Sequence, residues 1–265
     1  KFKKIKTNQI KNFLGVNYIH SSKKIFLYKN LNNWIEKKTV FNLCIISTNS
    51  DNRMYILNRI LSSMTVKNII LEKFLFNKLK DYKRALKISE VKSNSIYVNQ
   101  WISQSSNMRK IFYKFKNYNL DFKVSGTEWG MGSNIVHFID MIRFFKIRKN
   151  IFPKIIKSNL DPIVYPAKRK GFFEVYGDIA VEYGKHNLYA SCYKGNFDLR
   201  NSSNSIDIEI KARKFKNRYI KLNLKSGRIK GMQNFDRRIS HFSKKIELMS
   251  ELTGDVFKSL NKKKK

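Results

Sequence analysis

The chain has 265 residues, of which 42% are hydrophobic and 14% aromatic, and this excludes a disordered basic tail because such tails combine low hydrophobicity with high charge. Lysine and arginine outnumber aspartate and glutamate 55 to 19, and the resulting net charge of +36 predicts attraction to polyanions. No apolar run approaches the ~20 residues of a membrane-spanning helix, so we expect no membrane partner.

The first half of the chain alternates short apolar runs with helical patterns. Three runs are apolar on both faces and predict buried strands: Phe41 to Thr48, Val66 to Lys73 and Ser95 to Trp101. The segments between them, "DNRMYILNRILSSM" and "LKDYKRALKISE", repeat apolar residues at helical intervals, with Tyr55 or Ile56 beginning the stripe of the first. This alternation predicts an α/β fold with a doubly wound, Rossmann-like parallel sheet.

The rhythm changes near Trp101, where we place a boundary between two domains, residues 1–101 and 102–265. A basic helix is predicted around Arg109 to Lys116, and "LDFKVSGTEW" predicts a strand after it. Apolar residues then alternate in three stretches, 173–181, 206–210 and 220–224, and residues 241–260 carry the apolar stripe of an amphipathic helix. The second domain is therefore expected to be α+β with an open, mostly antiparallel sheet.

A glycine-bracketed turn precedes one further helix, in "SGTEWGMGSNIVHFIDMIRFF". Ser133 is the expected N-cap, and Ile135 and Ile142 belong to the predicted core face, whereas Asn134 and His137 fall on another face. A histidine in the first turns of a helix is held neutral by the dipole and can exchange a proton near neutral pH. A lone histidine beside an apolar face is more often structural, so the motif alone leaves both interpretations open.

Polar residues follow each of the three strands predicted in the first domain. In open α/β sheets, ligands lie outside the carboxyl ends of the strands. Each residue alone is compatible with a helix cap or a turn, but together they predict a binding site at this edge of the sheet. They are Ser47, Thr48 and Asn49 after the first strand, Glu72 and Lys73 after the second, and Asn99 after the third.

In this order, the motifs resemble the Gfo/Idh/MocA oxidoreductases, which include glucose-fructose oxidoreductase and inositol dehydrogenase. "LEK" is similar to the family's Glu-Lys-Pro signature and "HFIDMIRFF" to its His-x-x-Asp helix. The resemblance covers most of the chain from about Tyr28 onward, and it implies NAD or NADP as cofactor. It also implies that Lys73 and His137 are catalytic and that Ser47, Thr48, Asn49, Glu72 and Lys73 border the cofactor.

Three departures from the family pattern stand beside this resemblance. Phe74 replaces the signature proline, and Ser133 stands where many members carry aspartate. The family's opening strand and G-x-G-x-x-G turn are absent, because the only G-x-G, at Gly130 and Gly132, has Ile135 in the third position. We therefore expect an incomplete Rossmann-like sheet, a fragment of a longer protein, and cofactor binding only when the missing segment is present.

The expected function is hydride transfer between a nicotinamide cofactor and a hydroxyl or ketone of a sugar or nucleotide sugar. Candidate substrate contacts are Asn99, Trp129 and Asn134, with Lys168 and Arg169 as a phosphate clamp. Two alternatives stay open: a nucleic-acid-binding protein that uses short basic patches such as residues 108–118, and a catalytically inactive homologue.

Several further expectations concern partners and location. The four histidines have no ligand spacing to one another, so no metal site is predicted. Cys44 and Cys192 lie far apart in apolar runs, which favours buried free thiols and a cytoplasmic protein. The late strands are expected to form a homo-oligomer interface through the aromatic residues Phe172, Tyr176, Tyr189 and Tyr193.

Overall fold

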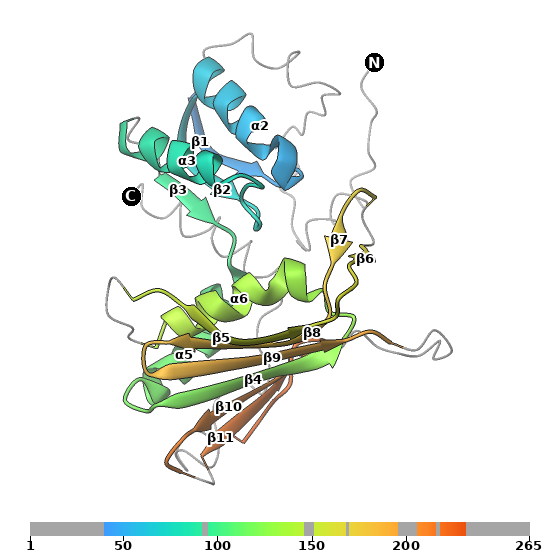
Figure 1. Ribbon diagram of the computed structural model, residues 1–265. Coiled ribbons are helices and arrows are strands. Elements are labelled where there is room, and N and C mark those ends of the chain that lie inside the picture. Colours follow the sequence, from blue (N-terminus) through green and yellow to red (C-terminus); the bar gives the residue numbers. More distant parts are fainter. Residues whose placement is uncertain are drawn as a thin grey trace, which may run out of the picture. The chain divides into compact units, whose positions relative to one another are not determined.

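The computed structural model describes residues 40–91, 95–145, 151–167, 170–195, 206–215 and 218–231. The chain divides into two compact units, residues 1–100 and 101–265. Figure 1 shows the elements of each unit. The predicted amphipathic helix at residues 241–260 lies outside the described residues. Among the helices that are described, none is both long and apolar enough to cross a membrane.

Unit 1 is a three-stranded parallel sheet with helices between its strands. In chain order its elements are β1 (Val40–Ile46), α2 (Ser50–Ser63), β2 (Thr65–Leu71), α3 (Leu79–Val91) and β3 (Ser95–Val98). The strands lie in the order β1-β2-β3, with Ile45 opposite Ile70 and Ile70 opposite Tyr97. The predicted parallel strand–helix alternation is confirmed, because β1 pairs with β2 and β2 with β3 in parallel.

The core of unit 1 lies between β2 and the buried stripe of α2. Leu57 and Ile69 are fully buried there, and Phe76 closes the core with its ring edge-on to Tyr82. Of the two residues proposed to begin the apolar stripe of α2, Ile56 packs partly against this core, whereas Tyr55 is exposed. The buried side chains of the helix are Arg53, Met54, Leu57, Ile60 and Leu61.

Unit 2 is a seven-stranded mixed sheet with helices packed on one face (Figure 1). Its helices are α4 (Trp101–Gln104), α5 (Ser106–Phe115) and α6 (Met131–Arg143). Its strands are β4 (Leu120–Thr127), β5 (Lys154–Leu160), β6 (Tyr165–Pro166), β7 (Phe173–Glu174), β8 (Gly177–Tyr183), β9 (His186–Tyr193), β10 (Ile206–Ala212), β11 (Tyr219–Asn223) and β12 (Ile229–Lys230).

The large sheet has the order β12-β11-β10-β4-β9-β8-β5. Only the β4–β9 pair is parallel among the described pairs of this sheet, so the prediction of a mostly antiparallel sheet is confirmed. Side chains alternate along β4: Leu120, Phe122 and Val124 are fully buried toward the helices, while Lys123 points to solvent. Phe122 meets Phe145 edge-on, and Phe145 meets Phe112 of α5 in the same way.

The stretch 173–181, predicted as one strand, is divided in the structure. β7 pairs with β6 in a separate two-stranded ribbon, and β8 begins only at Gly177. Gly177 has φ of +120°, and a Cβ there would lie 2.3 Å from the backbone oxygen of Asn159. The break therefore comes from a close approach of β5, which the hydrophobic pattern does not reveal.

Helix α6 begins earlier than predicted. Its N-cap is Gly130, with φ of +70°, and Ser133 lies in the first turn, where its Oγ donates to the Gly130 carbonyl oxygen at 3.2 Å. The core face also differs from the expected one, because His137 and Met141 are buried beside Phe138 and Ile142. Because the buried His137 is polar, the hydrophobic pattern alone places the core face of α6 away from it.

Candidate functional site

The residues predicted at the strand ends of unit 1 do lie side by side. The sheet's hydrogen bonding continues past the strands: the Glu72 amide donates to the Ile46 carbonyl at 3.0 Å, and the Asn99 amide to the Leu71 carbonyl at 2.8 Å. Asn99 Nδ2 then donates to Glu72 Oε2 at 2.9 Å. In this geometry Asn99 holds the Glu72 carboxylate, and its contact with a substrate stays a prediction.

Thr48 and Asn49 occupy the loop after β1. Asn49 is the N-cap of α2 with an extended backbone, and Ser47 is exposed. Thr48 Oγ1 is buried, and within the described part of the chain it has no hydrogen-bond partner. A buried hydroxyl of this kind is rarely left unsatisfied in a native protein, and it can donate to or accept from a bound group.

Lys73 follows Glu72 in the loop between β2 and α3 and is half-buried. The loop is fastened by Arg53 of α2, whose side chain is 2% exposed. Arg53 Nη1 donates to the carbonyl oxygens of Glu72 at 2.7 Å and Leu75 at 3.0 Å. It also donates to Phe74, and Nη2 donates to Thr48, so one guanidinium joins the loops after β1 and β2.

Arg53 was not among the residues predicted from the sequence, although its spacing carries a signal. Arg53, Leu57 and Ile60 are spaced by four and three residues, which is the spacing of one helix face. A charged side chain in line with an apolar stripe is seldom buried unless it has hydrogen-bond partners. The position of Arg53 in the stripe therefore indicates a buried side chain that binds polar groups of the protein.

In unit 2, His137 is buried in the second turn of α6. Its ring lies edge-on to Trp101, with the centroids 6.2 Å apart. One turn further on, Asp140 forms an ion pair with Arg143 at 3.2 Å. Burial raises the pKa of Asp140, and the raising is opposed by a hydrogen bond from Ser103 and by the charge of Arg143.

Trp129 and Asn134, predicted as substrate contacts, are used within the protein. The Trp129 indole is buried, its Nε1 donates to the Ser191 carbonyl at 2.8 Å, and its ring lies edge-on to Phe138. Asn134 Nδ2 donates to the Trp129 carbonyl at 2.5 Å. Both side chains thereby fix the turn that leads into α6, which is a structural role.

Glu174 of β7 supplies a carboxylate at the N-terminus of α6, and no sequence pattern predicts this contact. The Ser133 amide donates to Glu174 Oε2 at 3.3 Å. A Cβ at Gly132 would lie 3.1 Å from the same oxygen, so the carboxylate lies close against the glycine backbone. A negative charge at this position is stabilised by the helix dipole.

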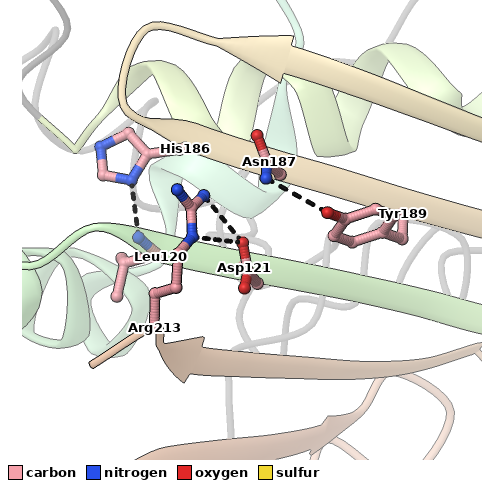
Figure 2. Close-up of polar contacts among 6 residues, drawn as sticks. All are labelled: Leu120, Asp121, His186, Asn187, Tyr189 and Arg213. Atoms are coloured by element: carbon pink, nitrogen blue, oxygen red, sulfur yellow. Dashed lines mark hydrogen bonds and ion pairs between the residues drawn. The ribbon is translucent and has the colours of Figure 1, made fainter. Parts of the chain in front are cut away.

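A second buried histidine, His186, begins β9 (Figure 2). The Leu120 amide donates to His186 Nδ1 at 3.2 Å, so the proton lies on Nε2, which donates to the Phe145 carbonyl at 3.1 Å. Burial lowers the pKa of His186 to about 4, with smaller opposing effects from the Phe145 hydrogen bond and from Asp121. This neutral histidine joins three chain segments and is structural.

Other candidates give less. Lys168 and Arg169, the predicted phosphate clamp, lie outside the described residues, as do His20 and His241. Among the residues whose placement is described, no group of three or more His, Cys, Asp or Glu side chains could hold a metal ion. Cys44 and Cys192 are free, and burial raises the pKa of the Cys44 thiol to about 11.

Comparison with solved structures shows the fold. GenD2 from gentamicin A biosynthesis, in complex with NAD, matches with a TM-score of 0.52 and 10% identity, over 82% of this chain and 61% of that chain. A candidate oxidoreductase from Erwinia carotovora atroseptica SCRI1043 matches with a TM-score of 0.53 and 12% identity, over 74% of this chain and 62% of that chain. An oxidoreductase from Sinorhizobium meliloti matches with a TM-score of 0.50 and 11% identity, over 75% of this chain and 56% of that chain.

The chain thus has the fold of these oxidoreductases, a Rossmann-like unit followed by an α+β unit. It spans between 56% and 62% of the length of the three solved chains. No protein-family model and no curated protein matches it.

Proposed function

We propose that the chain is part of a nicotinamide-dependent oxidoreductase of the Gfo/Idh/MocA family that acts on a hydroxyl or ketone of a sugar or nucleotide sugar. The observation that carries the proposal is the group of polar side chains at the carboxyl ends of β1, β2 and β3, where Asn99 holds Glu72 and the loop of Lys73 begins. Ligands of open α/β sheets lie at this edge. The fold shared with the NAD complex of GenD2 supports the same conclusion.

The residues at this edge fit the nicotinamide end of NAD or NADP. Thr48 Oγ1 is a buried hydroxyl without a partner in the described part of the chain, and only one Glu72 oxygen is engaged by Asn99. Thr48, Asn49 and Glu72 would hold the ribose and amide groups of the cofactor through hydrogen bonds. When bound, the cofactor would supply or accept the hydride.

Lys73 and His137 are the proposed catalytic residues. The ammonium of Lys73 would polarise the substrate oxygen, and His137 would exchange the proton of the hydroxyl. The role of Lys73 follows from the resemblance of "LEK" in unit 1, and the role of His137 from the resemblance of "HFIDMIRFF" in unit 2.

The proposal is tested with the 265-residue chain and with the longest natural product of the same reading frame. Binding of NADH and NADPH is followed by fluorescence, and turnover is measured on hexoses, inositols and nucleotide sugars. We expect Lys73→Met to lower kcat by about 100-fold or more while the Kd for NADH changes less than about threefold. Lys78→Met, on the exposed end of the same loop, is the matched control.

Each result has one interpretation. No binding of either nucleotide by the longest form overturns the oxidoreductase proposal, and unchanged turnover in Lys73→Met removes Lys73 from the mechanism. Binding without turnover on all substrates favours the inactive homologue.

We also propose that copies of the chain associate through the outer face of the large sheet, the face opposite the helices. Tyr189 and Tyr193 are exposed there at 42% and 54%, whereas Tyr176 packs partly against the core and does not belong to this face. Exposed tyrosines are enriched at interfaces. Sedimentation in moderate salt tests the idea, since a monomer at all concentrations up to tens of micromolar, about the range of weak association, overturns it.

A further inference from the structure

We propose that Arg53 is a positioning residue that fixes the backbone of the loop carrying Lys73. The catalytic role of Lys73 in this inference rests on the proposed function. The restraint that Arg53 places on the loop follows from contacts within unit 1. The guanidinium donates to carbonyls on both sides of Lys73: to Glu72 before it, and to Phe74 and Leu75 after it. A fourth donation, to Thr48, ties the loop to the end of β1.

The sequence of the loop itself does not restrict the backbone near Lys73. The sequence "LEKFLFNK" contains neither proline nor glycine, so no residue restricts the backbone covalently or permits an unusual turn. Phe74 is 38% exposed, whereas Leu75 packs partly against the core and Phe76 is buried at 3%. Arg53 therefore adds polar contacts to the carbonyls on both sides of Lys73, beside the packing that anchors the loop further on.

Arginine is suited to this task in a way that lysine is not. Its planar guanidinium presents five N–H donors in a fixed fork, whereas an ammonium presents a compact charge with three donors on a flexible stem. The two Nη groups reach four carbonyl oxygens from two loops; three of these oxygens share the two protons of Nη1, and the fourth accepts from Nη2. The burial of the side chain keeps water from competing for the same carbonyls.

Fixing a catalytic group in this way affects rate more than binding. A displacement of about 1 Å can cost about 100-fold in rate when a reacting group must be aligned. Loss of the Arg53 contacts should therefore lower kcat, while Glu72 keeps its hydrogen bonds to the Ile46 carbonyl and to Asn99.

The decisive experiment is hydrogen exchange on the full chain, comparing wild type with Arg53→Lys. We expect amides of residues 73–76 to exchange about tenfold or more faster in the variant, while β1, β2 and the sheet-bonded Glu72 amide keep wild-type protection. The matched control is Arg59→Lys on the same helix, which should leave the loop unchanged. Unchanged exchange at 73–76, or an equal loss of protection throughout unit 1, overturns the proposal.

Because a buried substitution can prevent folding, a second measurement uses the wild-type protein. A guanidinium held by four carbonyls rotates slowly about Nε–Cζ, so we expect resolved, slowly exchanging Nη protons for Arg53 in nitrogen-15 NMR spectra. A single averaged signal in rapid exchange with water overturns the proposal.

Activity then separates this inference from the proposed function. With a substrate identified, Arg53→Lys should lower kcat about 10- to 100-fold with less than about a threefold change in NADH affinity. The exchange and NMR results concern the loop alone, so they stand or fall whether or not the protein proves to be an oxidoreductase. Wild-type kcat in a variant whose loop exchanges faster overturns the positioning role.

Discussion

The two units use their strands differently. In unit 1, the strand residues Val40, Ile45 and Tyr97 remain 58%, 43% and 47% exposed, although parallel sheets are normally covered on both faces. In unit 2, the inward residues of β4 are completely buried and its outward residues are polar. Apolar burial therefore orders the sheet of unit 2, whereas the loops after β1 and β2 of unit 1 are also joined by the polar contacts of Arg53.

The largest expected effect comes from breaking the core of unit 2. Phe122 is fully buried at the centre of β4, edge-on to Phe145 at 5.0 Å and to His186 at 6.1 Å. Phe122→Ala should lower the free energy of unfolding by about 3–5 kcal/mol, because it removes the ring and leaves a cavity. Urea unfolding, followed by hydrogen exchange of β4 and β9, measures the loss.

A change in the exposed strand surface of unit 1 provides the comparison. Ile45→Thr keeps a β-branched side chain at a position that is nearly half exposed, so the free energy of unfolding should change by less than about 0.5 kcal/mol. Equal losses from the two substitutions would contradict the contrast between the units.

The second prediction uses pH to change the protonation of one buried residue of unit 2, His186. The folded-state pKa of His186, about 4, lies below the ordinary value of 6.5, so between these values the unfolded chain binds more protons. The contribution of His186 to stability is therefore complete above pH 6.5 and is lost as pH falls toward 4, up to about 3 kcal/mol.

The measurement compares urea midpoints of wild type and His186→Gln at pH values from 7 to 4. The glutamine cannot titrate, so the difference between the two slopes isolates the histidine from the carboxylates that also titrate. Parallel pH dependences in the two proteins would show that His186 is not held neutral.

Much of the fold follows from the sequence because strand apolarity and parallel topology are local signals. β1 and β2 end at Ile46 and Leu71, directly before the polar residues expected to gather at one edge. Parallel strands bring their carboxyl ends together, so the neighbouring positions of Glu72 and Asn99 could be predicted.

The rest could not be predicted, because it depends on contacts between distant segments. A buried Arg53 or His137 interrupts the hydrophobic pattern, so neither side chain was predicted to face the core, although Ile142 is buried as predicted. Glu174 reaches the N-terminus of α6 from 41 residues away, and nothing in its local sequence indicates this. β8 begins only at Gly177, because the backbone of β5 approaches closely there.

The smallest expected effect lies on the outer face of unit 2, where Arg213 donates to Asp121 Oδ1 through Nε at 3.2 Å and Nη2 at 2.9 Å (Figure 2). The two side chains are 42% and 31% exposed, so Asp121→Asn should cost about 0.2–1 kcal/mol, and the loss should vanish near 1 M salt.

Removing an acid also raises a net charge that already stands at +36, and this general repulsion could imitate the loss of an ion pair. Asp207→Asn is the matched control, because Asp207 lies on the same face and accepts at 2.8 Å from Asn223 Nδ2, a neutral donor that an asparagine oxygen also satisfies. Both substitutions change the net charge equally, but only the first removes an ion pair. Salt-dependent unfolding in urea distinguishes the two causes: a loss confined to Asp121→Asn measures the pair, and an equal loss in both variants assigns it to net charge.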